Sequence, residues 1–272
     1  IFTSKSNVLK FLENKIKFSK IEKNYDFTIE QWNENKKIII KEISEKFKSK
    51  KIIIRSSAIG EDSLEKSEAG NYDSILNINS ESTINVKNAI NKVIKSYELK
   101  NNSNPNNQIL VQTQTQNIKL SGVVMTHAGN LGAPYYVINY EVGPSSIGVT
   151  SGKIGNTIKI FKKTNLKNLE PKWKLLIKSI KEIEKICKNT SLDIEFAITK
   201  NRDIILFQVR PLVSKHITKF PNLENIIIKK ISENKKKYSK IKNEIKIHGK
   251  QKIFSDMTDW NPAEIIGNNP NE

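Results

Sequence analysis

The stretch LDIEFAITKNRDIILFQVRP, residues 192–211, holds two apolar runs on either side of the polar residues Lys-Asn-Arg. Short runs rich in Ile, Val and Phe that are separated by turn residues are typical of a β-hairpin. We therefore expect strands over 192–199 and 203–209, joined across 200–202. The hairpin also carries the polar side chains that are most informative about function.

Four polar side chains of this hairpin fall into two pairs. Because side chains alternate along a strand, Asp193 and Glu195 share one face, and Gln208 and Arg210 share a face of the partner strand. An acid and a carboxamide that meet across two strands offer oxygen ligands suited to Mg2+, and a guanidinium beside them neutralises phosphate charge. The pattern indicates a nucleotide and metal site; the alternative is an exposed hairpin held by salt bridges.

Further elements surround this hairpin in the second half of the chain. Apolar runs separated by Gly, Asn or Pro favour a mostly antiparallel sheet. The expected strands are 108–114, 122–126, 135–140 and 156–161. Helical spacing of apolar residues predicts a helix over 173–187, and a lysine-rich helix is expected beyond Pro211.

The first half alternates helices with strands, which places the chain in the α/β (α+β) class. Phe2 to Lys5 predicts a short strand and turn that open a helix, with Ser4 as its candidate cap. The expected helices are 8–16, 31–47 and 86–97, and the expected strands are 51–55 and 74–78.

A polar break over residues 101–107, which contains Pro105, is the best boundary between two lobes. It predicts an N-terminal lobe over 1–100 and a second lobe over 101–213 that carries the hairpin. Residues 214–272 are expected to form a basic linker that leads to a further, missing downstream region.

Composition limits the class of protein. The 272 residues carry a net charge of +18, but all except three of the 46 basic residues are lysines spread along the chain. This spread argues against nucleic acid as a partner, and a basic nucleic-acid-binding module stays as the alternative. The sequence has no run of about 18 apolar residues, which a membrane-spanning helix would need. We therefore expect a cytoplasmic protein without a membrane partner.

Arginine is the more informative cation because its planar fork holds phosphate oxygens in a way that lysine cannot copy. Arg55 and Ser56 open the sequence Arg-Ser-Ser-Ala at the end of a buried strand. Strand ends present ligand-binding loops, and this sequence offers a charged fork, hydroxyl donors and small side chains to a phosphate. The alternative is a surface arginine in a serine-rich turn.

An ordered series of motifs resembles the nucleotide domain of the pyruvate phosphate dikinase and phosphoenolpyruvate synthase family. The series is Arg55-Ser56-Ser57-Ala58, Glu61-Asp62 with Ala69-Gly70, Ser121-Gly122-Val123-Val124-Met125-Thr126, Asp193-Ile194-Glu195-Phe196 and Gln208-Val209-Arg210-Pro211. The resemblance spans residues 1–213 and implies an ATP-grasp-like fold, in which two lobes hold ATP between them.

The resemblance also implies roles for individual residues. Phosphate contacts are implied for Lys5, Arg55, Ser56 and Arg210, and Mg2+ ligation for Glu195 and Gln208. Adenine contacts are implied near Gln112, Thr113 and Gln114. Apart from the resemblance, Glu141, Thr150 and Asp193 are candidate substrate or nucleotide contacts. His127 follows Thr126 near the expected nucleotide site and is a candidate polar contact, but a structural role is the favoured interpretation for it.

Later residues resemble a narrower branch of the family, which includes the L-glutamine kinases of Campylobacter capsule phosphoramidate synthesis. The branch motifs are Val137 to Glu141, Thr150-Ser151-Gly152 and Ser255 to Gly267. The last motif makes Asp259 and Asn261 candidate substrate contacts; the alternative is a capped helix start with Pro262 in its first turn. This resemblance implies conversion of ATP, L-glutamine and water to AMP, phosphate and glutamine phosphorylated on its amide nitrogen.

The same resemblance implies a phosphohistidine intermediate on a C-terminal domain beyond Glu272. None of His127, His216 and His248 has the setting of a carrier histidine. The nearest alternative is another phosphoenolpyruvate synthase-like phosphotransferase, with pyruvate or an antibiotic as acceptor.

Overall fold

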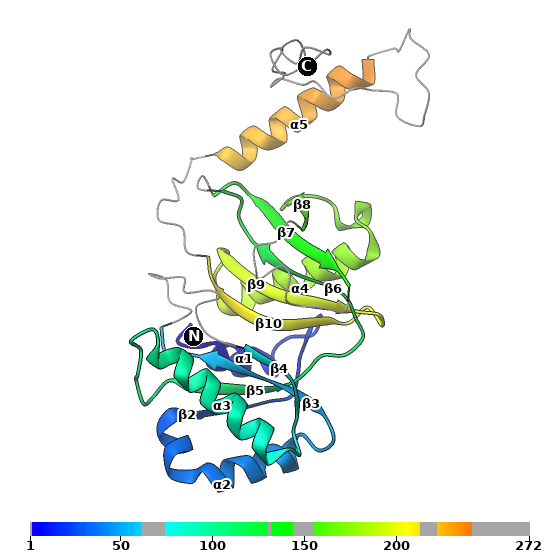
Figure 1. Ribbon diagram of the computed structural model, residues 1–272. Helices are drawn as coiled ribbons and strands as arrows, with labels where there is room; N and C mark the ends of the chain where they lie inside the picture. The colour runs from blue at the N-terminus through cyan, green and yellow to red at the C-terminus, as the bar shows by residue number, and fades with distance from the viewer. Residues whose placement is uncertain (1, 61–73, 130–131, 144–154, 213–221, 241–272) are drawn as a thin grey trace, which may run out of the picture. The chain divides into compact units, whose positions relative to one another are not determined.

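The computed structural model describes residues 2–60, 74–129, 132–143, 155–212 and 222–240. Ile1–Lys219 form one compact unit, and Phe220–Glu272 form a second. The described part of the second unit is helix α5, Leu223–Lys240, which confirms the lysine-rich helix expected after Pro211. The first unit contains two sheets, each with helices on one face (Figure 1).

The smaller sheet has four antiparallel strands in the order β2-β5-β3-β4. Its strands are β2 Asn24–Thr28, β3 Lys51–Ser57, β4 Ser74–Asn79 and β5 Gln108–Thr113. Helices α2, Ile29–Lys46, and α3, Thr83–Glu98, pack on one face of this sheet. The core between them is apolar; it includes Trp32, Ile43, Ile52, Ile54, Ile90, Val93, Ile109 and Val111.

The larger sheet has six strands in the order β1-β10-β9-β6-β7-β8. Its strands are β1 Lys20–Ile21, β6 Ile118–Met125, β7 Tyr135–Val142, β8 Asn156–Phe161, β9 Leu192–Thr199 and β10 Ile204–Pro211. Only the β1–β10 pair is parallel among the described strands. A short 3-10 helix, Leu166–Asn168, precedes helix α4, Pro171–Cys187.

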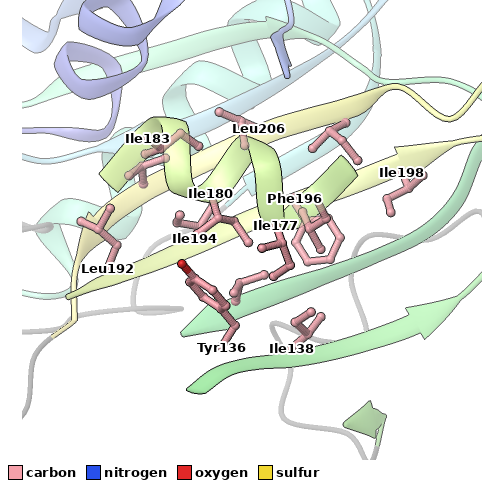
Figure 2. Close-up of a cluster of buried hydrophobic side chains, with 14 of the residues drawn as sticks. Tyr136, Ile138, Ile177, Ile180, Ile183, Leu192, Ile194, Phe196, Ile198 and Leu206 are labelled. Carbon is pink, nitrogen blue, oxygen red and sulfur yellow. The ribbon is translucent and has the colours of Figure 1, made fainter. Parts of the chain in front are cut away.

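Helix α4 buries its apolar face against the larger sheet. Figure 2 shows Ile177, Ile180 and Ile183 of this helix over side chains of the strands. The strand side of this cluster includes Tyr136, Ile138, Leu192, Ile194, Phe196, Ile198 and Leu206. Because even-numbered residues of β9 fill this core, the odd-numbered residues Asp193 and Glu195 lie on the opposite face of the sheet.

A β-bulge in β10 decides where the polar residues of that strand lie. Leu206 is opposite Phe196, but Gln208 is opposite Glu195, so β10 has one extra residue, Phe207. Strict alternation would send Gln208 to the core face with Leu206. The bulge reverses the phase and leaves Val209 in the core instead.

The helix ends follow local capping chemistry. Thr28 and Gln31 form a reciprocal capping box at the start of α2, and the Ser82 side chain caps α3. Ser4 caps helix α1, Lys5–Glu13, by accepting from the Asn7 amide, as predicted. Of the short strand and turn expected over Phe2 to Lys5, the turn is confirmed at Phe2 and Thr3, but the strand is wrong because the helix begins at Lys5.

The division predicted at residue 100 does not coincide with the two sheets. Strand β5, which follows the polar break, pairs with β2 and β3 in the smaller sheet. In contrast, β1 comes early in the chain but pairs with β10 in the larger sheet. Helix α1 touches both parts: Val8 and Leu12 enter the larger core, while Lys10 pairs with Asp26 of β2.

Among the described residues, no helix combines the length and the apolar character that crossing a membrane requires.

Candidate phosphate and metal site

Arg55 joins the two sheets of the first unit. Ile52 and Ile54 of β3 point into the helix-covered core, so alternation places Arg55 on the other face. There its Nη2 donates to Glu195 Oε2 at 3.2 Å, and its Nη1 donates to the Phe207 carbonyl oxygen at 3.2 Å. The guanidinium thus meets both strands of the hairpin, including the carbonyl of the bulged residue.

Arg210 and Asp193 form a second ion pair on the same hairpin. Arg210 donates from Nε at 3.0 Å and from Nη2 at 2.6 Å, both to Asp193 Oδ2. Burial raises the pKa of Asp193 and the Glu195 charge adds to the rise, while the Arg210 charge and hydrogen bond oppose it. The other oxygen, Oδ1, is buried and has no hydrogen-bond partner among the described residues. A buried acceptor of this kind favours a cation or a donor.

Glu195 and Gln208 lie directly opposite each other on β9 and β10, as the hairpin pattern predicted. Gln208 is buried, and the Glu195 carboxylate is partly exposed. Carboxylate and carboxamide oxygens suit Mg2+. Within the described ranges, no group of three or more His, Cys, Asp or Glu residues could hold a metal ion. Mg2+ usually takes one or two carboxylates together with phosphate and water oxygens, so Glu195 and Gln208 are the candidate ligands here.

The start of helix α1 packs against the end of β3. Lys5 is buried, and its Nζ donates to the Ser56 carbonyl oxygen at 3.2 Å. The Ser6 amide donates to Ser57 Oγ at 2.9 Å. The sequence-distant residues Lys5 and Arg55 therefore belong to one local structure.

The side chain of Ser56 lies on a different face from Arg55. Alternation along β3 sends it to the helix-covered face with Ile54, where it is buried. Ser57 shares the face of Arg55 instead. Only the backbone of Ser56, through its carbonyl oxygen, meets the predicted phosphate residue Lys5.

The three residues predicted near adenine lie at the end of β5. Gln112 is buried and pairs in register with both Asn24 and Ile53. Thr113 has a buried hydroxyl with no hydrogen-bond partner among the described residues. Gln114 forms two hydrogen bonds with Asn77, so its carboxamide is already engaged at the sheet edge.

His127 belongs to a different polar group from Arg55 and Glu195. Burial, followed by the Lys162 charge, lowers the pKa of His127 to about 4, while a hydrogen bond to the Thr190 backbone opposes the shift. Lys162 also donates to Glu184 at 2.8 Å. The surroundings formed by Lys162 and the Thr190 backbone favour a structural role for His127.

Glu141, a residue of β7, lies opposite Ser121 of β6. It is on the face of the larger sheet that carries Asp193 and Glu195.

Several predicted positions lie outside the described residues. They are Glu61, Asp62, Ala69, Gly70, Thr150, Ser151, Gly152, His216, His248, Asp259 and Asn261.

Comparison with known proteins bears on the domain that contains Arg55. Residues 29–103 match the family model described as pyruvate phosphate dikinase, AMP/ATP-binding domain. The match supports the family that the motif series resembles, and it covers α2, β3, β4 and α3. A comparison with curated proteins found no match.

Solved structures with partial likeness are ligases and synthetases at low identity. A D-alanine-D-alanine ligase from Coxiella burnetii is 9% identical, with 88% of this chain and 60% of that chain covered and a TM-score of 0.45. VanG D-Ala:D-Ser ligase from Enterococcus faecalis is 12% identical, with 82% and 56% covered and a TM-score of 0.45. This chain thus spans roughly three fifths of the length of these proteins. The predicted α/β class is confirmed by the two sheets and their helices.

Proposed function

We propose that this chain is the ATP-binding part of a phosphotransferase of the pyruvate phosphate dikinase and phosphoenolpyruvate synthase type. The observation that carries the proposal is the contact of Arg55 with Glu195, which lies opposite Gln208 on the neighbouring strand. Guanidinium, carboxylate and carboxamide groups together match the needs of a polyphosphate and its metal ion. The family match over residues 29–103 supports the nucleotide.

The cations of the site hold phosphate oxygens. Arg55, Arg210 and Lys5 come from β3, β10 and α1, so they approach the phosphates from separate elements. Without nucleotide, Arg55 donates to Glu195. When ATP binds, a phosphate oxygen replaces the Glu195 carboxylate as the acceptor for Arg55. Fixed charges of this kind position a phosphoryl group for in-line transfer and stabilise the charge that develops on it.

Glu195 and Gln208 are the residues that would hold Mg2+. A bound magnesium ion supplies charge neutralisation for the phosphates. Asp193 supports the arrangement by fixing Arg210, and its second oxygen faces no donor among the described residues. Gln112 to Gln114 are the proposed adenine side. Glu141, which lies on the same face of the larger sheet as Asp193, remains a proposed substrate contact.

The acceptor rests on the motif resemblance alone. By that resemblance, the whole enzyme passes a phosphoryl group from ATP through a histidine on another domain to the amide nitrogen of L-glutamine, with AMP and phosphate as the other products. Pyruvate and antibiotic hydroxyls are the competing acceptors. We propose that the chain of 272 residues binds MgATP without completing this reaction.

Two measurements test the proposal. Isothermal titration calorimetry of the chain with ATP should show one saturable, Mg2+-dependent event, and absence of binding would overturn the nucleotide assignment. Incubation with ATP and L-glutamine, with AMP followed by chromatography, should give no sustained release. Sustained glutamine-dependent AMP production would contradict the assignment of the carrier histidine to another domain.

A further inference from the structure

Tyr97 places a hydroxyl between the ends of two strands of the smaller sheet. It lies near the end of α3 and is fully buried in the core behind the sheet. Its Oη accepts a hydrogen bond from the Ser57 amide at 2.7 Å and donates one to the Gln108 carbonyl oxygen at 2.7 Å. Ser57 and Gln108 are the last register pair of β3 and β5. The phenol oxygen therefore bridges the backbones of the two strands where their pairing ends.

The strand end held by Tyr97 is the one that carries the phosphate residues of the proposed function. Arg55 is two residues before Ser57, and the Ser56 carbonyl oxygen accepts from Lys5. Ser57 Oγ also accepts from the amide of Ser6, so the start of α1 is hydrogen-bonded to this strand end.

Gln108, the first residue of β5, connects this second strand to the start of α1. Its Oε1 accepts from the hydroxyl of Ser4, the residue that caps α1. Tyr97 thus contacts the backbone of two residues, Ser57 and Gln108. Their side chains are hydrogen-bonded to the N-terminal end of α1, at Ser6 and at the capping residue Ser4.

We propose that Tyr97 is a positioning residue for the phosphate-binding groups, acting through the Ser57 and Gln108 backbones from behind the sheet. The inference rests on the proposed function and adds a determinant of affinity for the polyphosphate part of the ligand. Without the hydroxyl, the Ser57 amide loses its acceptor and the strand end is free to shift. A shift of even a fraction of an ångström then moves the Arg55 and Lys5 groups together, and such sites tolerate little displacement.

The test is Tyr97→Phe, which keeps the aromatic ring in the core and removes only the hydroxyl. We expect MgATP to bind about tenfold more weakly, the equivalent of one lost hydrogen bond, while adenosine binding changes little. Tyr136→Phe is the matched control, because Tyr136 is also buried and donates to Glu184 in the other core. It should lower the melting temperature and leave the MgATP dissociation constant unchanged.

A second variant covers the case in which Tyr97→Phe fails to fold. Ser57→Ala removes the acceptor of the Ser6 amide and should also weaken MgATP more than adenosine. The inference is overturned if the Tyr97→Phe protein, or Ser57→Ala in its place, binds MgATP as tightly as the wild type. It is also overturned if both tyrosine variants weaken binding equally. Failure of the wild type to bind MgATP would instead remove the proposed function on which the inference rests.

Discussion

The two sheets of the first unit use the same layered plan but bring different sets of side chains to the candidate site. Each has helices on one face, and each carries the charged side chains of the candidate site on the other face. The smaller sheet contributes Arg55 by plain alternation along β3. The larger sheet contributes two acids from β9, and the bulge in β10 brings Gln208 and Arg210 to the same face.

In the proposed function the smaller sheet supplies one cation, Arg55, whereas the larger sheet supplies the metal ligands together with the cation Arg210. A polyphosphate needs cations, whereas its metal ion needs oxygen ligands, and a site with both must keep them from neutralising each other permanently. In the described residues Arg55 pairs with Glu195 across the sheets, at a distance of 3.2 Å. In the proposed function, bound MgATP would replace this contact on both sides, with phosphate for Arg55 and the metal ion for Glu195.

Removal of Arg55, the cation of the smaller sheet, should have the largest effect on the affinity for MgATP. Arg55→Ala removes a charge-assisted contact and should weaken MgATP on the order of 100-fold, so that the thermal shift caused by MgATP disappears. Arg202→Ala is the matched control, because Arg202 is exposed in the β9–β10 turn. An unchanged MgATP shift in Arg55→Ala would mean that the smaller sheet does not supply the phosphate cation.

A second change disturbs the larger sheet without touching a charge. A Cβ added to Gly122 of β6 would lie 2.3 Å from the Asn139 carbonyl oxygen of β7. Because this contact is with backbone, Gly122→Ala should lower the free energy of unfolding by about 1–3 kcal/mol in urea denaturation.

Gly129→Ala is the comparison for that experiment, since its added Cβ meets no atom within 4 Å and only the positive φ of +58° opposes it. An equal decrease in the free energy of unfolding for the two variants would show that β6 and β7 can move apart more easily at Gly122 than the structure indicates.

Neutralising Glu195 of the larger sheet should distinguish binding of the metal ion from binding of the phosphates. Glu195→Gln keeps the size of the side chain, so we expect about a tenfold loss of affinity for MgATP, but little loss for ATP in the presence of EDTA. Calorimetry with and without Mg2+ measures both. Glu182→Gln serves as control, because Glu182 accepts from the Lys17 and Phe18 amides. The same Mg2+ dependence in Glu195→Gln and wild type would exclude Glu195 as a ligand.

The smallest effect concerns the pH dependence of stability. The pKa of His127 is about 4 in the folded protein against 6.5 ordinarily, mainly because of burial. Between these values the unfolded chain binds a proton that the folded chain does not, so stability falls as pH decreases from 6.5 to 4.

His127→Gln removes that proton uptake. Its melting temperature should decrease less than that of the wild type between pH 7 and pH 4.5, by on the order of a few degrees. Parallel curves for the two proteins would show that His127 titrates normally.

Local patterns predicted most elements of this fold, because periodicity and capping act within a few residues. The helix expected over 86–97 lies inside α3, and the hairpin expected from residue 192 onward is β9 and β10. The capping role of Ser4 was also readable from its place before an apolar period.

Long-range pairing was not predictable in the same way. Nothing near β5 specifies that it joins β2 and β3, since that choice depends on packing across the whole sheet. Two-residue strands such as β1 carry no periodic signal. The phase change at Phe207 was likewise hidden within an apolar run, although the polar residues after it were a hint.

For the candidate site, the sequence predicted which residue types take part better than it predicted how their side chains are arranged. The pairing of Glu195 with Gln208 follows from alternation together with the bulge, and the sequence argument reached it from alternation alone. The same rule places Ser56 on the core face of β3, a consequence that the motif resemblance obscured. The support by Tyr97 depends on α3 packing behind the sheet and has no local signature.

The most direct test of the account is a crystal structure of the protein with Mn2+ and a non-hydrolysable ATP analogue, in which anomalous scattering locates the metal. The account predicts a manganese peak within about 2.0–2.3 Å of the Glu195 and Gln208 side-chain oxygens, with Arg55 bound to phosphate rather than to Glu195. A nucleotide bound elsewhere, with the Arg55–Glu195 pair intact, would contradict it.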